Sequence, residues 1–292
     1  MDEPGGRVVE WVASVVGAEV VGVVGLGGGG TWRVRFGGVV ADVVVKVGRR
    51  REPAVVEVAA LERTAEFGVA APRLVGADLS GELAGAFAVV TTLIQGSSRV
   101  PVGVRPERLR ELGAAAARLH RVVVGPTAEL PLRARAIEDV DFAVGWRAGV
   151  LAEAEEALRG FDRKAGEWVF LHGDLWQGNT MWVGDSFVGM VDWDGAGVGP
   201  SGVDLGSLRC DAAMLHGPGA AELVLDGWQR EAGGVASDVA CWDVVAALGT
   251  PADMSAWLPV FHGQGRGDLD ARTATGRRDG FLRAALTVLR RG

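Results

Sequence analysis

The sequence contains, at residues 171–179, the stretch LHGDLWQGN, which says more about the fold than any other segment. Asp174 and Asn179 lie five residues apart in it, and Asp192 follows Asn179 by thirteen residues. The residues between Asn179 and Asp192 predict a β-hairpin. One loop would therefore present Asp174 and Asn179, and the hairpin would return Asp192 to the same place.

Side chains of these kinds match the needs of phosphoryl transfer from a nucleotide. One carboxylate accepts or orients the proton of the attacking hydroxyl, while a second carboxylate and an amide oxygen hold Mg²⁺. An Asp, an Asn five residues later and an Asp at the end of the next hairpin would supply that set.

The first hundred residues are rich in β-type runs, and the later residues are mostly helical in pattern. Glycines at 25–30 and 37–38 separate the first three runs, and Gly68 is a helix stop signal. The sequence predicts an α+β protein with a small antiparallel β-rich lobe at 1–95 and a larger helical lobe at 96–292. The predicted strands are 19–24, 31–36, 39–47, 73–76 and 87–93, with further β structure within 168–193. The predicted helices are 8–16, 53–67, 106–122 and 142–161, and a series that begins at 203.

The segments 172–179 and 191–194 together resemble the aminoglycoside phosphotransferase and choline kinase superfamily, whose members are relatives of the eukaryotic protein kinases. The resemblance implies a bilobal protein-kinase-like fold. It also implies that Asp174 is the catalytic carboxylate and that Asn179 and Asp192 are magnesium ligands.

Two further segments are similar to motifs of this family. The stretch GPSGVDL at 199–205 resembles its next motif, which implies that Asp204 braces the catalytic loop. We expect a similar bracing role for His172. Residues 109–120 resemble a helix of the family, and its last residue, His120, is expected to be structural.

A kinase-like first lobe requires a glycine-rich hairpin, a Lys on the third strand and a Glu on the next helix. Lys46 lies on the third β-type run and is one of two lysines in the chain, beside 28 arginines. Glu57 lies one turn into the next helix, with Glu52 and Glu62 as alternatives. The connector at 89–93 would be the hinge, whose backbone binds adenine. The residues expected to bind the nucleotide are Gly27, Gly28, Gly29, Gly30, Lys46, Glu57, Thr91 and Leu93.

Acidic residues are concentrated in the second half of the chain. Residues 138–243 contain 19 Asp and Glu but only 6 Lys and Arg, a surplus that would repel nucleic acid and attract a cation. We therefore expect a hydroxyl-bearing, amine-containing acceptor such as an aminoglycoside antibiotic. The acids that could line its cleft are Asp211, Glu222, Asp226, Glu231, Asp238 and Asp243. The residues expected to contact the acceptor are Gln177, Asp194 and Asp211.

The expected activity is transfer of the γ-phosphate of ATP, with GTP as the alternative, to a hydroxyl of such a molecule in the presence of Mg²⁺. A kinase for a neutral sugar or an amino alcohol is one alternative. A nucleotide-binding pseudokinase without turnover is another.

Several other classes are disfavoured. The glycines at 25–30 also satisfy the dinucleotide-binding pattern, but a strand-forming run follows them where that pattern requires a helix. No apolar run approaches the length that spans a bilayer. The two cysteines, Cys210 and Cys241, are too few for a disulfide framework. We expect a cytoplasmic protein that binds neither nucleic acid nor membranes, and the sequence leaves its oligomeric state open.

Overall fold

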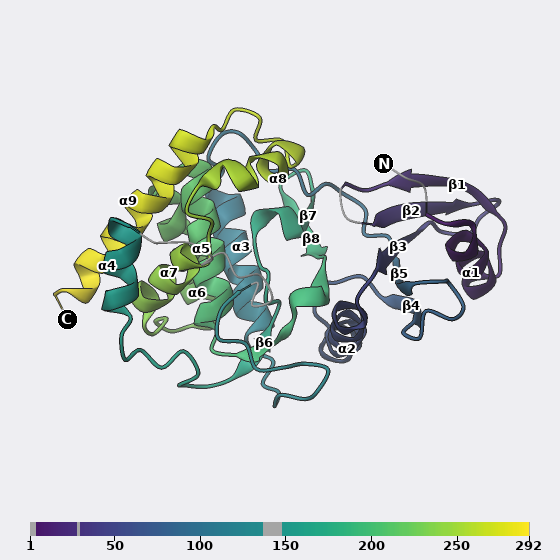
Figure 1. The fold of residues 1–292 in the computed structure, drawn as a ribbon, viewed down its shortest axis with the longest axis horizontal. Helices are drawn as coiled ribbons and strands as arrows, with labels where there is room; N and C mark the ends of the chain where they lie inside the picture. The colour runs from purple at the N-terminus through teal and green to yellow at the C-terminus, as the bar shows by residue number, and fades with distance from the viewer. Residues whose placement is uncertain (1–3, 28–29, 137–147, 292) are drawn as a thin grey trace. The chain divides into compact units, whose positions relative to one another are not determined.

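The computed structural model describes residues 4–27, 30–136 and 148–291, and its contacts divide the chain into two compact units (Figure 1). The first unit consists of Met1–Gly96 and Val188–Asp194, and the second of Ser97–Phe187 and Gly195–Gly292. We call Val188–Asp194 the return segment, because it brings seven residues of the second half back to the first unit.

An antiparallel sheet with the strand order β1-β2-β3-β5-β4 forms the centre of the first unit. The expected strand at 39–47 begins only at Val43, because Val39 lies in the turn after β2 and is fully exposed. The strands are β1 (Val20–Gly25), β2 (Thr31–Phe36), β3 (Val43–Gly48), β4 (Leu74–Asp78) and β5 (Phe87–Thr92).

The two helices of this unit approach the sheet from opposite faces. Helix α1 (Gly6–Val16) packs its buried residue Val12 into an apolar core that includes Val45 of β3. Side chains alternate along a strand, so Lys46, the next residue, points to the other face. Helix α2 (Arg51–Phe67) packs on that face, against β3, β4 and β5. It ends at Gly68, which has a left-handed φ of 69°.

The second unit is mainly helical, and its central helix is α5 (Gly202–His216). It packs against α6, α7 and α9 and is buried on nearly every side (Figure 1). The predicted helix at 142–161 begins within 137–147, outside the described residues, and the structure describes α4 there from Val150. The remaining helices are α3 (Pro106–Leu119), α4 (Val150–Ala157), α6 (Gly219–Ala232), α7 (Val239–Leu248), α8 (Leu258–Gly263) and α9 (Ala271–Leu289).

Short strands frame the loop that contains residues 172–179. Strand β6 (Val169–Leu171) enters the loop and pairs with β9 (Gly197–Gly199), while β7 (Thr180–Val183) leaves it and pairs with β8 (Ser186–Met190). A β-rich antiparallel unit and a helical unit form the α+β architecture that the sequence predicted. None of the helices described in the structure has the length and apolar character needed to cross a membrane.

Candidate active site

Lys46 is the centre of a charged cluster in the first unit. Its Nζ donates hydrogen bonds to Asp192 and, at 2.8 Å, to Oδ2 of Asp194, both from the return segment. On the other side, Glu57 Oε2 of α2 lies 3.6 Å from the same nitrogen. The alternatives Glu52 and Glu62 are exposed. The structure thus brings three of the residues selected from the sequence around the ammonium group of a fourth, Lys46.

The charges in this cluster do not balance, because one ammonium faces three carboxylates. Burial lowers the pKa of Lys46, but Glu57, Asp192 and Asp194 outweigh it and raise the pKa overall. Burial raises the pKa of Glu57 to about 7, although Lys46 opposes this shift. Negative charge is therefore in excess at the exposed side of the cluster, where it favours an additional cation.

Asp192 has an unusual backbone conformation. Its φ is 69°, in the left-handed region that residues other than glycine seldom adopt, although Asp tolerates it better than most. The segment before it is anchored, because the Met190 N–H donates to Ala70 O at 2.8 Å and Trp193 Nε1 donates to Met190 O at 3.0 Å. The side chain of Asp192 remains 45% exposed, which leaves its carboxylate able to meet a ligand.

The glycine-rich turn between β1 and β2 is described only in part, since Gly28 and Gly29 lie outside the described residues. Gly27 and Gly30 have φ values of 109° and 86°, and a Cβ on Gly30 would lie 2.6 Å from Val47 O. Both the backbone angle and the close approach require glycine here.

The residues expected at the hinge lie at the end of β5. Thr91 is buried and pairs with Val44 and Leu74 in the sheet, and Leu93 follows the last residue of the strand.

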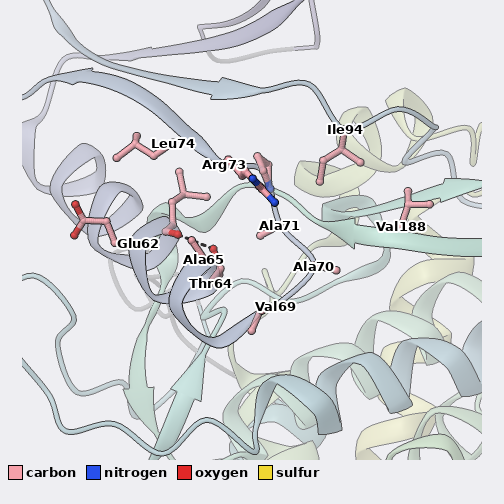
Figure 2. Close-up of a pocket in the computed structure, with 13 residues that line it drawn as sticks. Glu62, Thr64, Ala65, Val69, Ala70, Ala71, Arg73, Leu74, Ile94 and Val188 are labelled. Atoms are coloured by element: carbon pink, nitrogen blue, oxygen red, sulfur yellow. Dashed lines mark hydrogen bonds between the residues drawn. The ribbon is translucent and has the colours of Figure 1, made fainter. Parts of the chain in front are cut away.

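The first unit also contains a pocket that is separate from the charged cluster. Figure 2 shows the residues that line it. It has a volume of about 790 Å³ and lies between the second half of α2, the 68–73 turn and Val188. Glu62, the exposed alternative to Glu57, lines it, but neither Lys46 nor Glu57 does. We do not assign the candidate site to this pocket.

In the second unit, Asp174 and Asn179 contact each other directly. Asn179 Nδ2 donates to Oδ2 of Asp174 at 3.0 Å and to its backbone oxygen at 2.9 Å. The amide nitrogen is thereby directed to Asp174, and the amide oxygen is the group with which Asn179 could meet a cation.

Asp204 of α5 binds the beginning of this loop. Its carboxylate is fully buried and accepts hydrogen bonds from the backbone N–H groups of His172 at 2.7 Å and Gly173 at 2.9 Å. Gly173 has a φ of 78°, and a Cβ there would overlap the backbone oxygen of Gly195. The buried carboxylate of Asp204 therefore binds the loop on one side, and the backbone of Gly195 packs against the loop on the other.

Two buried histidines complete this support. His172 accepts a long hydrogen bond of 3.4 Å from the Asp174 N–H through Nδ1. His120 accepts one from Trp228 Nε1 through Nδ1 at 3.0 Å, so its Nε2 carries the hydrogen that faces Asp204 at 3.4 Å.

Gln177 and Asp211, both expected to contact the acceptor, are buried at 1% and 4% exposure and bind each other. They lie in the interior, which favours a structural role. Asp194, the third such residue, binds Lys46.

Most of the other acids expected to line a cleft already have arginine partners. Four of the six are paired in this way, although Glu222 and Asp243 share one arginine, and they provide less uncompensated negative surface than the sequence suggested. The pairs are Glu222 and Asp243 with Arg209, Asp226 with Arg110 and Arg230, and Glu231 with Arg118 and Arg121.

Arg133, which is buried beside this loop, was not among the residues selected from the sequence. Its Nε and Nη2 both donate to Ala196 O at 3.2 Å, and its N–H donates to Val198 O at 2.7 Å. Ala196 follows the residue that packs on Gly173. As one arginine among 28, outside any motif, Arg133 could not be singled out.

Within the described ranges, no group of three His, Cys, Asp or Glu side chains is arranged to hold a metal ion. The carboxylates of Glu57, Asp192 and Asp194 converge on Lys46 instead.

Comparison with known families and structures identifies the family and the fold of this chain. The model of a family described as the phosphotransferase enzyme family matches residues 25–248. No curated protein matches the chain.

Similar solved structures include an aminoglycoside-3'-phosphotransferase of type VIII, at 22% identity and a TM-score of 0.57, over 82% of this chain and 98% of that one. A macrolide 2'-phosphotransferase, MphH from Brachybacterium faecium, is 20% identical with a TM-score of 0.57, over 93% and 95% of the two chains. A thermostable mutant of aminoglycoside phosphotransferase APH(4)-Ia, in a ternary complex with ADP and hygromycin B, is 15% identical with a TM-score of 0.63, over 95% and 98%. These similarities confirm the kinase-like fold.

Proposed function

The chain belongs to the phosphotransferase enzyme family and is a small-molecule kinase, and from this premise we propose that it transfers the γ-phosphate of ATP to a hydroxyl group, with Asp174 as the catalytic base. The observation that carries the proposal is the contact of Asp174 with Asn179 in a loop whose backbone is bound by the buried Asp204. A base must be held in place before it can orient a hydroxyl, and two independent contacts do so here.

The proposed role of Lys46 is to bind the phosphates of the nucleotide. Its ammonium group lies at the exposed side of the cluster, and Glu57 holds it from the buried side. A triphosphate would replace Asp192 and Asp194 as partners of the ammonium group, while Glu57 would remain. The backbone of the glycine-rich turn would contact the same phosphates, and the backbone near Thr91 and Leu93 would bind the base.

Asn179 and Asp192 fit the role of magnesium ligands by their chemistry, since an amide oxygen and a half-exposed carboxylate are both hard oxygen donors. The excess of carboxylates around Lys46 supports a cation near Asp192. A bound magnesium ion would neutralise charge on the transferring phosphoryl group. Asp174 would then accept the proton of the acceptor hydroxyl.

The acceptor is proposed to be a hydroxyl-bearing small molecule. The similar structures bind or act on antibiotics by their descriptions, so aminoglycosides and macrolides are the first candidates, and a role in antibiotic resistance would follow. The pairing of Glu222, Asp226, Glu231 and Asp243 with arginines favours a second candidate. A neutral sugar carries no cation and therefore does not need uncompensated acids, whereas an amino alcohol is protonated at neutral pH.

The test is ADP release by the purified protein with Mg-ATP and a panel of aminoglycosides, macrolides, neutral sugars and amino alcohols. We expect at least one class to stimulate release. Asp174→Ala should lower that rate by about 10²–10⁴-fold and leave nucleotide binding nearly unchanged. Asp185→Ala, on an exposed carboxylate paired with Arg105, is the matched control and should keep full activity.

Tight nucleotide binding without turnover of any acceptor would favour a pseudokinase. Full activity of Asp174→Ala would remove Asp174 from the role of base.

A further inference from the structure

Helix α5 contributes two polar side chains, Asp211 and His216, that both bind the same residue of the loop. The N–H and the Nε2 of Gln177 donate to Oδ2 of Asp211 at 3.2 and 3.0 Å. His216 Nε2 lies 3.2 Å from Gln177 Oε1. Both polar ends of the Gln177 side chain are therefore attached to one helix.

The hydrogen on His216 can be assigned from these contacts. Because Gln177 donates its amide hydrogen to Asp211, its Oε1 is an acceptor, and His216 Nε2 must be the donor. Burial lowers the pKa of His216 to about 4, and Arg266, Arg277 and Arg108 contribute, while Asp268 opposes them. The ring is thus neutral at neutral pH, with its hydrogen on Nε2.

The position of Gln177 affects both residues of the proposed active site. It begins the short turn Gln177–Asn179, and Thr180 Oγ1 donates to its backbone oxygen at 2.7 Å. Asn179, two residues later, is the residue that binds Asp174. A shift of Gln177 would therefore move Asn179 and alter its contact with Asp174.

We propose that Asp211 and His216 are positioning residues, which hold Gln177 so that the loop presents Asp174 and Asn179 in reactive geometry. The expected effect on catalysis rests on the proposed function, but the positioning of the loop by Asp211 and His216 does not. If Asp211 and His216 only filled space, apolar side chains of similar size would support the loop equally well. The charge of Asp211 would then have no effect on the conformation of the loop.

The hydrogen bonds between Gln177 and Asp211 depend on pH, because Asp211 can be protonated. Burial raises its pKa to about 7, against the hydrogen bonds from Gln177 and the charge of Arg266. Above this pH the ionised carboxylate accepts both hydrogen bonds of Gln177. As the pH falls through about 7, protonation weakens it as an acceptor, and the hold on the loop loosens.

Two substitutions separate these possibilities by kinetics. Asp211→Leu should lower kcat by about 10²-fold, the order expected for a misplacement near 1 Å, and leave the KM for ATP within about 2-fold. Asp211→Asn keeps an acceptor oxygen but cannot titrate, so it should retain kcat at pH 8 and lose the part of the decline towards pH 6 that comes from Asp211. Asp185→Asn, on the exposed carboxylate paired with Arg105, is the control and should behave as the wild type.

Hydrogen exchange reports how firmly the loop is positioned, and it does not require any turnover. In Asp211→Leu the amides of 173–180 should exchange faster than in the wild type, while those of α9 stay unchanged. Gln177→Met, which leaves α5 intact, should give the same result and serves if Asp211→Leu does not fold.

Unchanged exchange in 173–180, in a folded variant, would overturn the proposal. A wild type without turnover would count against the proposed function, and the exchange measurement would still decide whether Asp211 and His216 hold the loop.

Discussion

Lys46 Nζ lies 3.6 Å from Glu57 Oε2, so that the third strand and the helix after it share one ion pair in the first unit. Asp192 and Asp194 reach the same ammonium group from residues almost 150 positions later. A single cation therefore holds together three elements, and its removal would leave three carboxylates facing one another.

This arrangement predicts the effect of Lys46→Met. We expect turnover to fall by about 10²–10³-fold, since a preorganised donor to the phosphates is lost, and the KM for ATP to rise. Lys164→Met changes the only other lysine, which is exposed, and should have no effect on either constant. Steady-state kinetics of both variants check this. Equal effects of the two substitutions would show that Lys46 has no special role.

Magnesium dependence tests the role proposed for Asp192. Asp192→Asn keeps the size of the side chain, and Asn tolerates the left-handed φ of this position, but the ligand charge is lost. We expect the magnesium concentration for half-maximal activity to rise by about 10-fold or more, because Mg²⁺ prefers carboxylate oxygen. Titration of activity with MgCl₂ measures it, with Asp185→Asn as the control. An unchanged titration would exclude Asp192 as a ligand.

The pKa of Asp78, at the end of β4, predicts that low pH destabilises the folded state of the first unit. Burial opposes its ionisation, but hydrogen bonds from Ala84, Ser80 and Leu83 outweigh this and lower its pKa to about 2. A lowered carboxyl pKa stabilises the folded state above the ordinary value near 4, and this contribution is lost as the pH falls from about 4 to about 2. It amounts to about 2 kcal/mol.

Asp78→Asn should accordingly be less stable than the wild type in urea at pH 7, and the gap should narrow between pH 4 and pH 2. Glu82→Gln, at a nearby exposed position, should show no such change. A gap that is the same at both ends of this range would mean that the charge of Asp78 does not contribute.

Arg209 offers an internal comparison of buried and exposed ion pairs. Its Nε is 2.9 Å from Asp243, whose side chain is 6% exposed, and its Nη2 is 3.1 Å from Glu222, which is 69% exposed. Asp243→Asn leaves a guanidinium buried without its main partner and should destabilise the second unit by about 3–5 kcal/mol.

Glu222→Gln, which removes the exposed partner of the same arginine, should cost about 1 kcal/mol or less. Urea unfolding of the two variants gives both numbers. Similar losses from the two substitutions would contradict the difference expected from burial.

The sequence predicted the first unit well because its signals are local. Alternating apolar residues mark β2 at Thr31–Phe36, and Gly68 ends α2 with the left-handed φ that glycine allows. The strand β9 was missed, because Gly197–Gly199 has two glycines and no such alternation. The position of Val188–Asp194 in the first unit was also not predicted, because the expected lobes met at a single boundary between residues 95 and 96.

The environment of α5 was the least predictable part of the site. The helix is buried on nearly every side, so its sequence has no polar face from which the surroundings of Asp211 could be inferred. The same holds for the acids expected in a cleft, because their partners Arg110 and Arg209 come from positions up to 116 residues away. Contacts of this kind depend on tertiary packing and leave no pattern along the chain.

The return segment also limits how this protein can be divided. The Met190 N–H binds Ala70 O, and a Cβ on Gly189 would lie 3.0 Å from that same oxygen, so the segment is closely fitted to the first unit. A gene fragment that ends at residue 96 would lack it and would leave Lys46 with Glu57 alone. A first half expressed alone would therefore lack two of the three carboxylates around Lys46, and a circular permutant opened within Val188–Asp194 would interrupt the fit of this segment.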